Sequence, residues 1–429
     1  MTTDLRELLE LASEDVPDPD LAEDAWGAAQ RGRRLVRRRT LLGAGAVAAA
    51  GVATTVVLRE RGGSPSQAST TPSTPTTPSR LANAVVGGAT VDLAPDPGSE
   101  ALLAPYPAAE SMGMPPRLGF AESRLVPALN PIAARRVNFA SVRAVLLAAI
   151  GEPGGSVTPV IHTPRGPDPY LALNRVVLRP TSGPDGDSGD LLDPRTISDD
   201  RRRLVFPQPG AVVVADAREG TSATFEVPDE FLTHAGWAKD GSTVVAWGGE
   251  RSWTVDVVTG KVVEVEPGPA RPGWVDLHTG RDGTTSLRSF SGAGRFTGSR
   301  PLRGAPISVF GSSVSNTEAF AAASTFLGQT YIGATTRHQG LVAAQGDLRP
   351  VPRVLAASTD PAVPRGAFRP LVWGPKDVIL LESRSFPPGA GAPVIRVLAW
   401  DVIGGTLTRV SEVGPVRRAD GGFTGSYVL

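Results

Sequence analysis

The sequence predicts an all-β fold, a six- or seven-bladed β-propeller that occupies residues 82–429. Two observations predict it. Apolar runs of four to seven residues are separated by clusters of Gly, Pro and Asp, which is the pattern of short strands joined by tight turns. In addition, a unit of about forty residues with three or four such runs recurs along the chain, and this period is typical of propeller blades.

The clearest copy of the unit predicts three antiparallel strands, the last two joined by the glycine turn Val258-Thr259-Gly260-Lys261. Its expected strands are 243–247, 252–257 and 262–265. Two further copies are less regular, and their expected strands are 203–206, 211–216, 223–227, 378–381, 395–401 and 407–410. Residues 82–136 match no blade, and residues 142–150 fit either a strand or a helix.

An aspartate turn stands before a strand in each copy, and we expect it just before the innermost strand. Residues 197–204 (ISDDRRRL) and 237–244 (WAKDGSTV) carry it, and residues 373–378 match more weakly. These segments resemble the Ser-Pro-Asp-Gly blade motif of WD40-like and TolB-type propellers, although the first two lack its proline. A pair of β-sandwiches is the structural alternative, and the recurring turn with a nearby Trp favours the propeller.

An arginine cluster next to an uncharged segment predicts how the chain meets a membrane. Six arginines lie within residues 31–39, and residues 40–58 carry no charge. Nineteen helical residues span just under the ~30 Å hydrocarbon core. The positive-inside bias then places residues 1–39 in the cytoplasm and the C-terminal part outside the membrane. We therefore expect one transmembrane helix and an extracytoplasmic propeller.

The same junction has a second interpretation, a cleaved export signal. The sequence Arg38-Arg39-Thr40-Leu41-Leu42 resembles the twin-arginine export motif, and Ala48-Ala49-Ala50 offers small residues for cleavage. The apolar segment continues to Leu58, which favours an uncleaved anchor. Residues 59–81 are expected to be a linker, because fourteen of the eighteen residues from Gly62 to Ser79 are Ser, Thr or Pro.

Residues 1–39 form an acidic segment followed by the arginine cluster. Their apolar residues fall at helical spacing, but two such short helices cannot build a core together. They can serve as a docking segment for a cytoplasmic partner or as a solvated acidic tail. The residues expected to contact such a partner are Leu5, Leu8, Leu9, Leu21 and Trp26.

The start of the chain also resembles a known group of membrane proteins. Asp4 to Leu9, Val16-Pro17, Leu21-Ala22 and Gly32-Arg33-Arg34 precede the apolar segment. This arrangement resembles actinobacterial membrane proteins associated with extracytoplasmic-function sigma factors. The resemblance implies a sigma factor as the cytoplasmic partner. The zinc-binding His and Cys pattern of many anti-sigma domains is absent, since the chain has no Cys.

No motif in the sequence predicts catalytic, cofactor-binding or metal-binding residues. Gly186-Asp187-Ser188-Gly189 copies the nucleophile motif of trypsin-like proteases, but Asp190-Leu191 follows where that family has Gly-Pro. We therefore interpret it as a polar loop. Its carboxylates do not have the spacing of an EF-hand, and the four His residues are too widely spaced to form a short metal pair.

These observations favour a non-enzymatic propeller that binds a protein, peptide or glycan outside the membrane, with signalling through a cytoplasmic partner as a possible role. The chain has 43 basic and 43 acidic residues, so the balance of charge argues against a nucleic-acid partner. An exported propeller-type hydrolase or lyase, using carboxylates at the channel mouth, is the alternative. Most of the six tryptophans beyond the linker are expected to pack between blades, with one or two on a ligand face.

Overall fold

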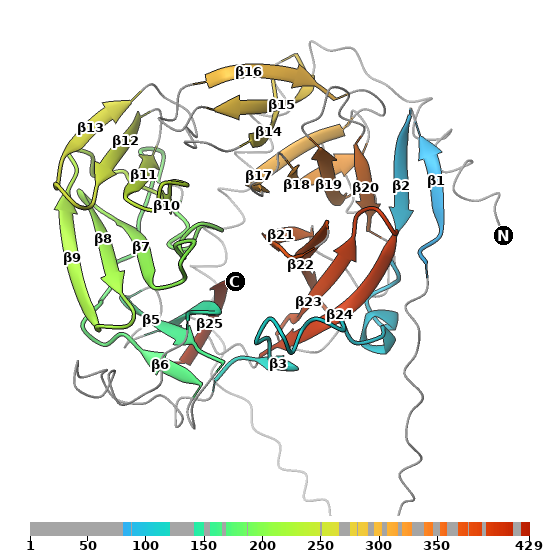
Figure 1. The fold of residues 1–429 in the computed structure, drawn as a ribbon, viewed down its shortest axis with the longest axis horizontal. Helices are drawn as coiled ribbons and strands as arrows, with labels where there is room; N and C mark the ends of the chain where they lie inside the picture. The colour runs from blue at the N-terminus through green and yellow to red at the C-terminus, as the bar shows by residue number, and fades with distance from the viewer. Residues whose placement is uncertain are drawn as a thin grey trace, which may run out of the picture. The chain divides into compact units, whose positions relative to one another are not determined.

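The computed structural model shows an all-β fold in which six sheets form a six-bladed propeller (Figure 1). The described residues are 80–86, 88–120, 141–149, 155–164, 169–186, 188–248, 251–265, 275–280, 282–290, 296–302, 307–315, 320–327, 339–345, 352–357, 368–375, 377–387, 392–414 and 422–429. The sheets confirm the predicted fold class and fix the blade number at six, and they exclude the β-sandwich pair.

Blades I to III follow one another around the ring (Figure 1). Blade I contains β25 (Gly422–Val428), β4 (Ala144–Ala149), β5 (Val157–His162) and β6 (Tyr170–Ala172). Blade II contains β7 (Arg203–Gln208), β8 (Ala211–Asp216) and β9 (Thr221–Glu226). Blade III contains β10 (His234–Trp237), β11 (Thr243–Gly248), β12 (Arg251–Asp256) and β13 (Val262–Val265). The C-terminal strand β25 pairs antiparallel with β4, so this pairing closes the ring.

Blades IV to VI complete the ring. Blade IV contains β14 (Val275–Thr279), β15 (Thr285–Phe290) and β16 (Phe296–Pro301). Blade V contains β17 (Ile307–Ser315), β18 (Phe320–Leu327), β19 (Gln339–Gln345) and β20 (Arg353–Ala356). Blade VI contains β21 (Arg369–Trp373), β22 (Val378–Ser385), β23 (Val394–Asp401) and β24 (Thr406–Val413). All three predicted copies of the unit are strands, and the segment with an ambiguous pattern is strand β4.

Each aspartate turn follows the innermost strand of its blade, whereas the sequence predicted it just before that strand. In blades III and VI, the turn joins the innermost strand (β10 or β21) to the second strand (β11 or β22). Blade II follows the same scheme, because Ile197 bridges Leu204 of β7 and therefore occupies the innermost position. The innermost strands are four or five residues long in blades III and VI, too short to show a clear alternating pattern in the sequence.

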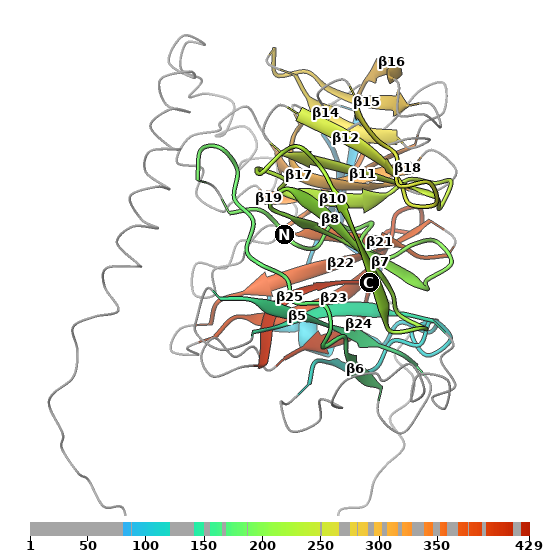
Figure 2. The same ribbon diagram turned by 90° about the vertical axis from the view of Figure 1, so that its left-hand side faces the viewer.

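The apolar core is divided among the spaces between neighbouring blades. Five clusters of buried side chains lie between blades I and II, II and III, IV and V, V and VI, and VI and I. Figure 2 shows the last of these junctions, where β25 of blade I lies beside β22 and β23 of blade VI. Each sheet is therefore covered by its neighbours rather than by helices, as a propeller requires.

The segment before blade I forms a strap along the outer edges of blades V and VI; we use this name for residues 83–118. Its strands are β1 (Asn83–Val86), β2 (Ala89–Leu93) and β3 (Arg117–Leu118). Strand β2 pairs in parallel with β20, and β3 pairs in parallel with β24. This segment adds edge strands to two blades, which explains why its sequence matches no blade.

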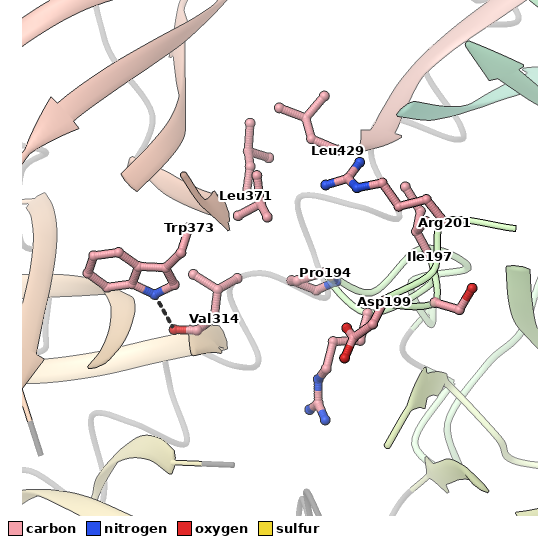
Figure 3. A pocket seen from close by; sticks show the side chains of 11 residues that line it. Pro194, Ile197, Asp199, Arg201, Val314, Leu371, Trp373 and Leu429 are labelled. Carbon is pink, nitrogen blue, oxygen red and sulfur yellow. Dashed lines mark hydrogen bonds between the residues drawn. The ribbon is translucent and has the colours of Figure 1, made fainter. Parts of the chain in front are cut away.

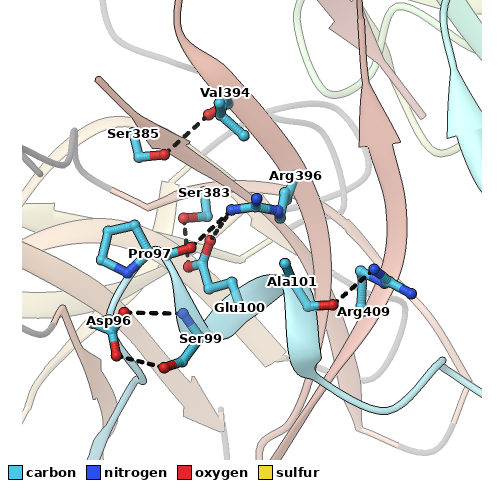
Figure 4. A network of polar contacts seen from close by, with 10 residues as sticks. All are labelled: Asp96, Pro97, Ser99, Glu100, Ala101, Ser383, Ser385, Val394, Arg396 and Arg409. Atoms are coloured by element: carbon cyan, nitrogen blue, oxygen red, sulfur yellow. Dashed lines mark hydrogen bonds and ion pairs between the residues drawn. The ribbon is translucent and has the colours of Figure 1, made fainter. Parts of the chain in front are cut away.

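Buried acidic side chains fasten the strap to the two blades. Glu100, in the short 3-10 helix η2 (Ser99–Leu102), is 1% exposed and accepts a hydrogen bond from Ser383 at 2.7 Å. It also pairs with Arg396 at 3.4 Å, and Arg409 donates to the Ala101 carbonyl at 2.8 Å (Figure 4). Both carboxylate oxygens of Glu100 have partners, as a buried charge requires.

Gly248, the last residue of β11, is expected to tolerate no side chain. A Cβ at this position would collide with the backbone carbonyl of Phe231, which is not free to move as a flexible side chain would be. We expect Gly248→Ala to destabilise the fold by about 1–3 kcal/mol, the usual cost of overpacking. Gly298→Ala is the matched control, because a Cβ there meets nothing within 4 Å. Thermal unfolding of both variants checks this, and equal melting temperatures would contradict the observed packing.

Candidate functional site

A cavity of about 140 Å³ lies at the centre of the ring; we call it the channel-end cavity. Its walls come from the innermost segments of blades I, II, V and VI, which are distant in sequence (Figure 3). The lining residues are Pro194, Arg195, Ile197, Ser198, Asp199, Arg201, Val314, Leu371, Val372, Trp373 and Leu429. The charged members all belong to the segment of blade II, and they face an apolar wall built by the other blades (Figure 3).

The apolar wall is held in place by packing and by one hydrogen bond. Val314, Leu371 and Leu429 are buried, with at most 5% of each residue exposed. The indole nitrogen of Trp373 donates a hydrogen bond to the Val314 carbonyl at 3.2 Å (Figure 3). This bond links β21 to β17 and sets the orientation of the indole ring. The wall therefore presents a fixed apolar surface to the cavity.

The charged side of the cavity is the aspartate turn of blade II. The Ser198 hydroxyl donates to Asp200 Oδ1 at 2.6 Å and accepts from the Arg203 backbone N–H at 3.0 Å. Asp200 also accepts from the Arg202 backbone N–H at 3.1 Å. Ser198 and Asp200 are thus engaged in holding the turn. Asp199 and Arg201 also line the cavity, and their side chains are the candidates for contact with a ligand.

Arg201 has a left-handed backbone conformation, with φ +55°. In the equivalent turn of blade III this place is held by Gly241, with φ +67°. A side chain at positive φ costs about 1–3 kcal/mol, and glycine would avoid that cost. Such strain at a cavity is a feature of functional residues, so Arg201 is the first candidate for a role in binding.

Burial and neighbouring charges both act on the ionisable side chains of the site. Desolvation raises the pKa of Asp199 above its usual value, while the positive charges of Lys239, Arg195 and Arg201 oppose that rise. Burial lowers the pKa of Arg201 and the positive charge of Arg143 lowers it further, whereas Asp199 acts in the opposite direction.

Two of the guanidinium groups are anchored by backbone carbonyls. Arg201 Nη1 donates to the carbonyl of Val142 at 3.3 Å, and Arg195 Nη1 donates to the carbonyl of Trp237 at 3.5 Å. Each bond uses one of the five N–H donors of a guanidinium. The forked geometry of a guanidinium suits a carboxylate in general, because a carboxylate accepts two parallel hydrogen bonds.

The volume of the cavity limits what it can hold. A cavity of about 150 Å³ accommodates benzene, whereas sites for drug-sized ligands measure about 300–1,000 Å³. The channel-end cavity at about 140 Å³ is therefore suited to one side chain or one small group. A larger ligand must lie outside it and insert a single residue.

The predicted partner-binding residues and the protease-like motif are not part of this site. Leu5, Leu8, Leu9, Leu21 and Trp26, as well as the expected membrane span, lie outside the described residues. None of the helices in the described part of the chain is long and apolar enough to cross a membrane. Ser188 is exposed and forms an isolated bridge with Ser182, and Gly186 turns the chain at φ +78°. These features fit the predicted polar loop.

The aspartate-rich loop and the histidines form no metal site in the part of the chain that the structure describes. Within the described ranges, no group of three or more His, Asp or Glu side chains is placed to hold a metal ion. Asp193 accepts a hydrogen bond from the Arg195 backbone N–H at 3.0 Å, which shapes the loop entering the cavity. His162 is buried in blade I, and His234 stacks on Trp247 with ring centroids 5.2 Å apart.

Three of the tryptophans beyond the linker are buried, as predicted for packing between blades. Trp237, Trp253 and Trp400 are buried, with 2%, 5% and 0% of each residue exposed. Trp373 lines the channel-end cavity. The sequence analysis interpreted Asp199 and Arg201 only as residues of the blade motif. The signal that could have identified them is Arg201 itself, because it occupies the position at which the motif has glycine.

No protein-family model and no curated protein sequence matches the chain. Among solved structures, Kuenenia stuttgartiensis hydrazine synthase is 12% identical, with a TM-score of 0.38 over 59% of this chain and 78% of that chain. The propeller domain of the trilobed protease from Pyrococcus furiosus is 12% identical, with a TM-score of 0.37 over 68% and 95%. TolB from Acinetobacter baumannii is 10% identical, with a TM-score of 0.37 over 65% of each chain. These likenesses concern the fold alone, and the six paired sheets establish the propeller independently.

Proposed function

We propose that this chain is a non-enzymatic, membrane-anchored protein whose extracytoplasmic propeller binds a protein, peptide or glycan at the channel-end cavity. The observation that carries the proposal is the arrangement of this cavity, in which a charged turn faces a fixed apolar wall. A few oriented polar groups within an apolar surround are the usual features of a ligand site. The strained backbone of Arg201 supports a role for the same residues.

The membrane anchor and the cytoplasmic partner of this proposal rest on the sequence. The arginine cluster before the uncharged residues 40–58 supports one membrane span with the N-terminus in the cytoplasm. The acidic helical segment supports a protein partner on that side, such as a sigma factor. In this arrangement, a ligand held by the propeller changes the association or position of the chain, and residues 1–39 pass that change to the partner.

The test for ligand binding is photo-cross-linking in living cells. A photoreactive amino acid replaces Trp373 in the cavity or Thr224 on the exposed outer strand β9. We expect a discrete adduct from position 373 and none from position 224. Equal labelling at the two positions, or no adduct from position 373, would count against a ligand site at the centre of the ring.

A second candidate, an exported hydrolase or lyase, is favoured by the raised pKa of Asp199, because general acids commonly have such shifts. The variant Asp199→Asn separates the two candidates in the cross-linking experiment. An enzyme with a disabled acid retains its substrate, so the yield of adduct should rise. A binding protein should give an unchanged or lower yield, and this is the outcome we expect.

The cytoplasmic partner is tested separately by a pull-down from native membranes. Residues 1–39 serve as bait, and a bait with Leu8, Leu9 and Trp26 replaced by Asp serves as the control. We expect a partner that the native bait retains and the control releases, since apolar anchors dominate helix docking. If the two baits retain the same proteins, residues 1–39 are a solvated tail or a leader.

A further inference from the structure

We propose that strand β1 is a self-association surface, at which two copies of this chain pair antiparallel about a two-fold axis between their Ala84 residues. This strand is the terminal member of the six-stranded sheet that blade V forms with the strap. It lies at the outer rim of the ring, and none of the described strands pairs with its side away from β2 (Figure 1). The inference goes beyond the proposed function, because its partner is a second copy of the chain.

The register of β1 on β2 shows which backbone groups point outward. The Leu93 N–H donates to the Ala82 carbonyl at 2.8 Å, so these two residues form a hydrogen-bonded pair. Hydrogen-bonded and non-hydrogen-bonded pairs alternate along an antiparallel ladder. Continuing the register, Ala84 is hydrogen-bonded to β2, whereas Asn83 and Val85 belong to non-hydrogen-bonded pairs. The N–H and C=O groups of Asn83 and Val85 therefore point away from β2.

The open part of this edge is short and symmetric. Before it, the outward N–H of Leu81 donates to the carbonyl of Gly405 in blade VI at 2.8 Å. Asn83 and Val85 have no such partner among the described residues, and they flank Ala84 on either side. An antiparallel copy can place Asn83 of one chain opposite Val85 of the other, and this contact occurs twice. The pairing forms four backbone hydrogen bonds, with the two Ala84 residues facing each other.

The composition of β1 favours a second copy as the partner. Residues 81–91 carry no charge, so a two-fold axis that brings the same residues together causes no like-charge repulsion. Charges on outer strands hinder such pairing, and β9, β13 and β16 carry Glu226, Glu264 and Arg300. Strand β1 lacks this protection, and its Val85 is 74% exposed although it is apolar.

A membrane tether would strengthen this small contact. Four hydrogen bonds are fewer than the roughly ten of a typical interface, so the pairing of freely diffusing copies is expected to be weak. Tethering raises the effective concentration of two surfaces without any new contact. Residues 59–81, the predicted linker, lead from the uncharged segment into β1. This step rests on the membrane anchor of the proposed function.

The test is single-cysteine cross-linking of the full chain in native membranes. The chain has no Cys, so each variant carries one thiol. Facing residues of a non-hydrogen-bonded pair have Cα atoms about 4.5 Å apart, within the range of a disulfide. We expect Ala84→Cys to give a disulfide-linked dimer under mild oxidation. Val85→Cys should give about tenfold less, because the two copies of residue 85 lie diagonally, about 7–8 Å apart.

Val258→Cys is the control for random collision, because Val258 is 78% exposed and lies in the turn between β12 and β13. It should give no more dimer than Val85→Cys. Equal yields from positions 84 and 258, or a higher yield from position 85 than from position 84, would overturn the proposed pairing.

A matched pair of second substitutions, each made in Ala84→Cys, tests the backbone contact. Val85→Pro removes an N–H that β2 does not use, so the strap should remain folded while the outer edge loses a donor. Val85→Thr keeps this N–H. We expect Val85→Pro to lower the yield of dimer about tenfold and Val85→Thr to leave it unchanged, with equal melting temperatures. Equal yields from the two would show that the copies do not meet through this edge.

Alkaline extraction of the same membranes separates failure of this inference from failure of the proposed anchor. If the chain stays in the membrane and Ala84→Cys forms no dimer, the pairing is overturned and the anchor stands. If the chain is released, the anchor fails, and the purified full chain is then oxidised at high concentration. A dimer specific to position 84 supports the pairing there, and its absence overturns both.

Discussion

Replacing Asp92 with Ala is expected to lower the free energy of unfolding by about 3–5 kcal/mol, the usual effect of removing one partner from a buried ion pair. Asp92 lies on β2 of the strap and is completely buried. Arg353 of blade V donates to both of its carboxylate oxygens, at 2.9 and 3.0 Å. The Trp400 indole of blade VI donates to it at 3.1 Å. The variant leaves a guanidinium and a buried N–H without these contacts and detaches the strap from two blades.

Chemical denaturation of the native chain and three variants checks this expectation. The variants are Asp92→Ala, Arg353→Met and the double variant, and all are followed by tryptophan fluorescence. The double variant should be more stable than the sum of the two single effects predicts, because it leaves no unpaired charge. Two outcomes would show that this pair does not hold the strap. One is strictly additive effects of the two single variants. The other is a loss of less than about 1 kcal/mol in the free energy of unfolding of Asp92→Ala, which is the usual effect at a surface pair.

Acidification is expected to destabilise the propeller through His162. This residue is 3% exposed, and its ring centroid lies 5.0 Å from that of Tyr170. Burial, with a smaller contribution from the positive charge of Arg143, lowers the pKa of His162 from 6.5 to about 4. Between these values the unfolded chain binds a proton that the folded chain does not. Stability is therefore complete above pH 6.5, and about 3 kcal/mol is lost as the pH falls to 4.

The variant His162→Gln isolates this contribution. Carboxylates titrate in the same range in both proteins, so the difference between the two stability curves belongs to the imidazole. We expect the native chain to lose stability more steeply than the variant between pH 6.5 and 4, with parallel curves above pH 7. Parallel curves over the whole range would mean that the imidazole is protonated equally well in the folded and unfolded chain.

Local chemistry in the sequence was sufficient to predict most of blades II, III and VI. Alternating apolar runs and a turn such as that at Gly260, with φ +74°, are decided by neighbours along the chain. The ring closure and the strap depend instead on distant contacts. Asp92 meets Arg353 across 261 residues and Trp400 across 308. No pattern near Asp92 in the sequence reports those partners.

The channel-end cavity was harder to predict for the same reason. Its lining comes from residues 194–201, from Val314, from residues 371–373 and from Leu429. Only the folded ring brings these together. Asp199 and Arg201 belong to the blade motif, and the sequence therefore predicted only that they form a turn. The proposal that they bind a ligand rests on the left-handed backbone of Arg201 and on the apolar wall opposite, neither of which a single sequence shows.

Methyl NMR of the full chain is the most direct test of the claim that the channel-end cavity is the ligand site. Leucine and valine methyl groups are labelled, and short peptides and oligosaccharides are added one at a time. We predict that the resonances of Val314, Leu371 and Leu429, which line the cavity, shift on titration. Those of Leu102, in η2, and Val258, in the turn between β12 and β13, should stay in place, because these residues are 84% and 78% exposed and do not line the cavity. Shifts confined to exposed methyl groups, or no shift at all, would contradict the assignment of the cavity.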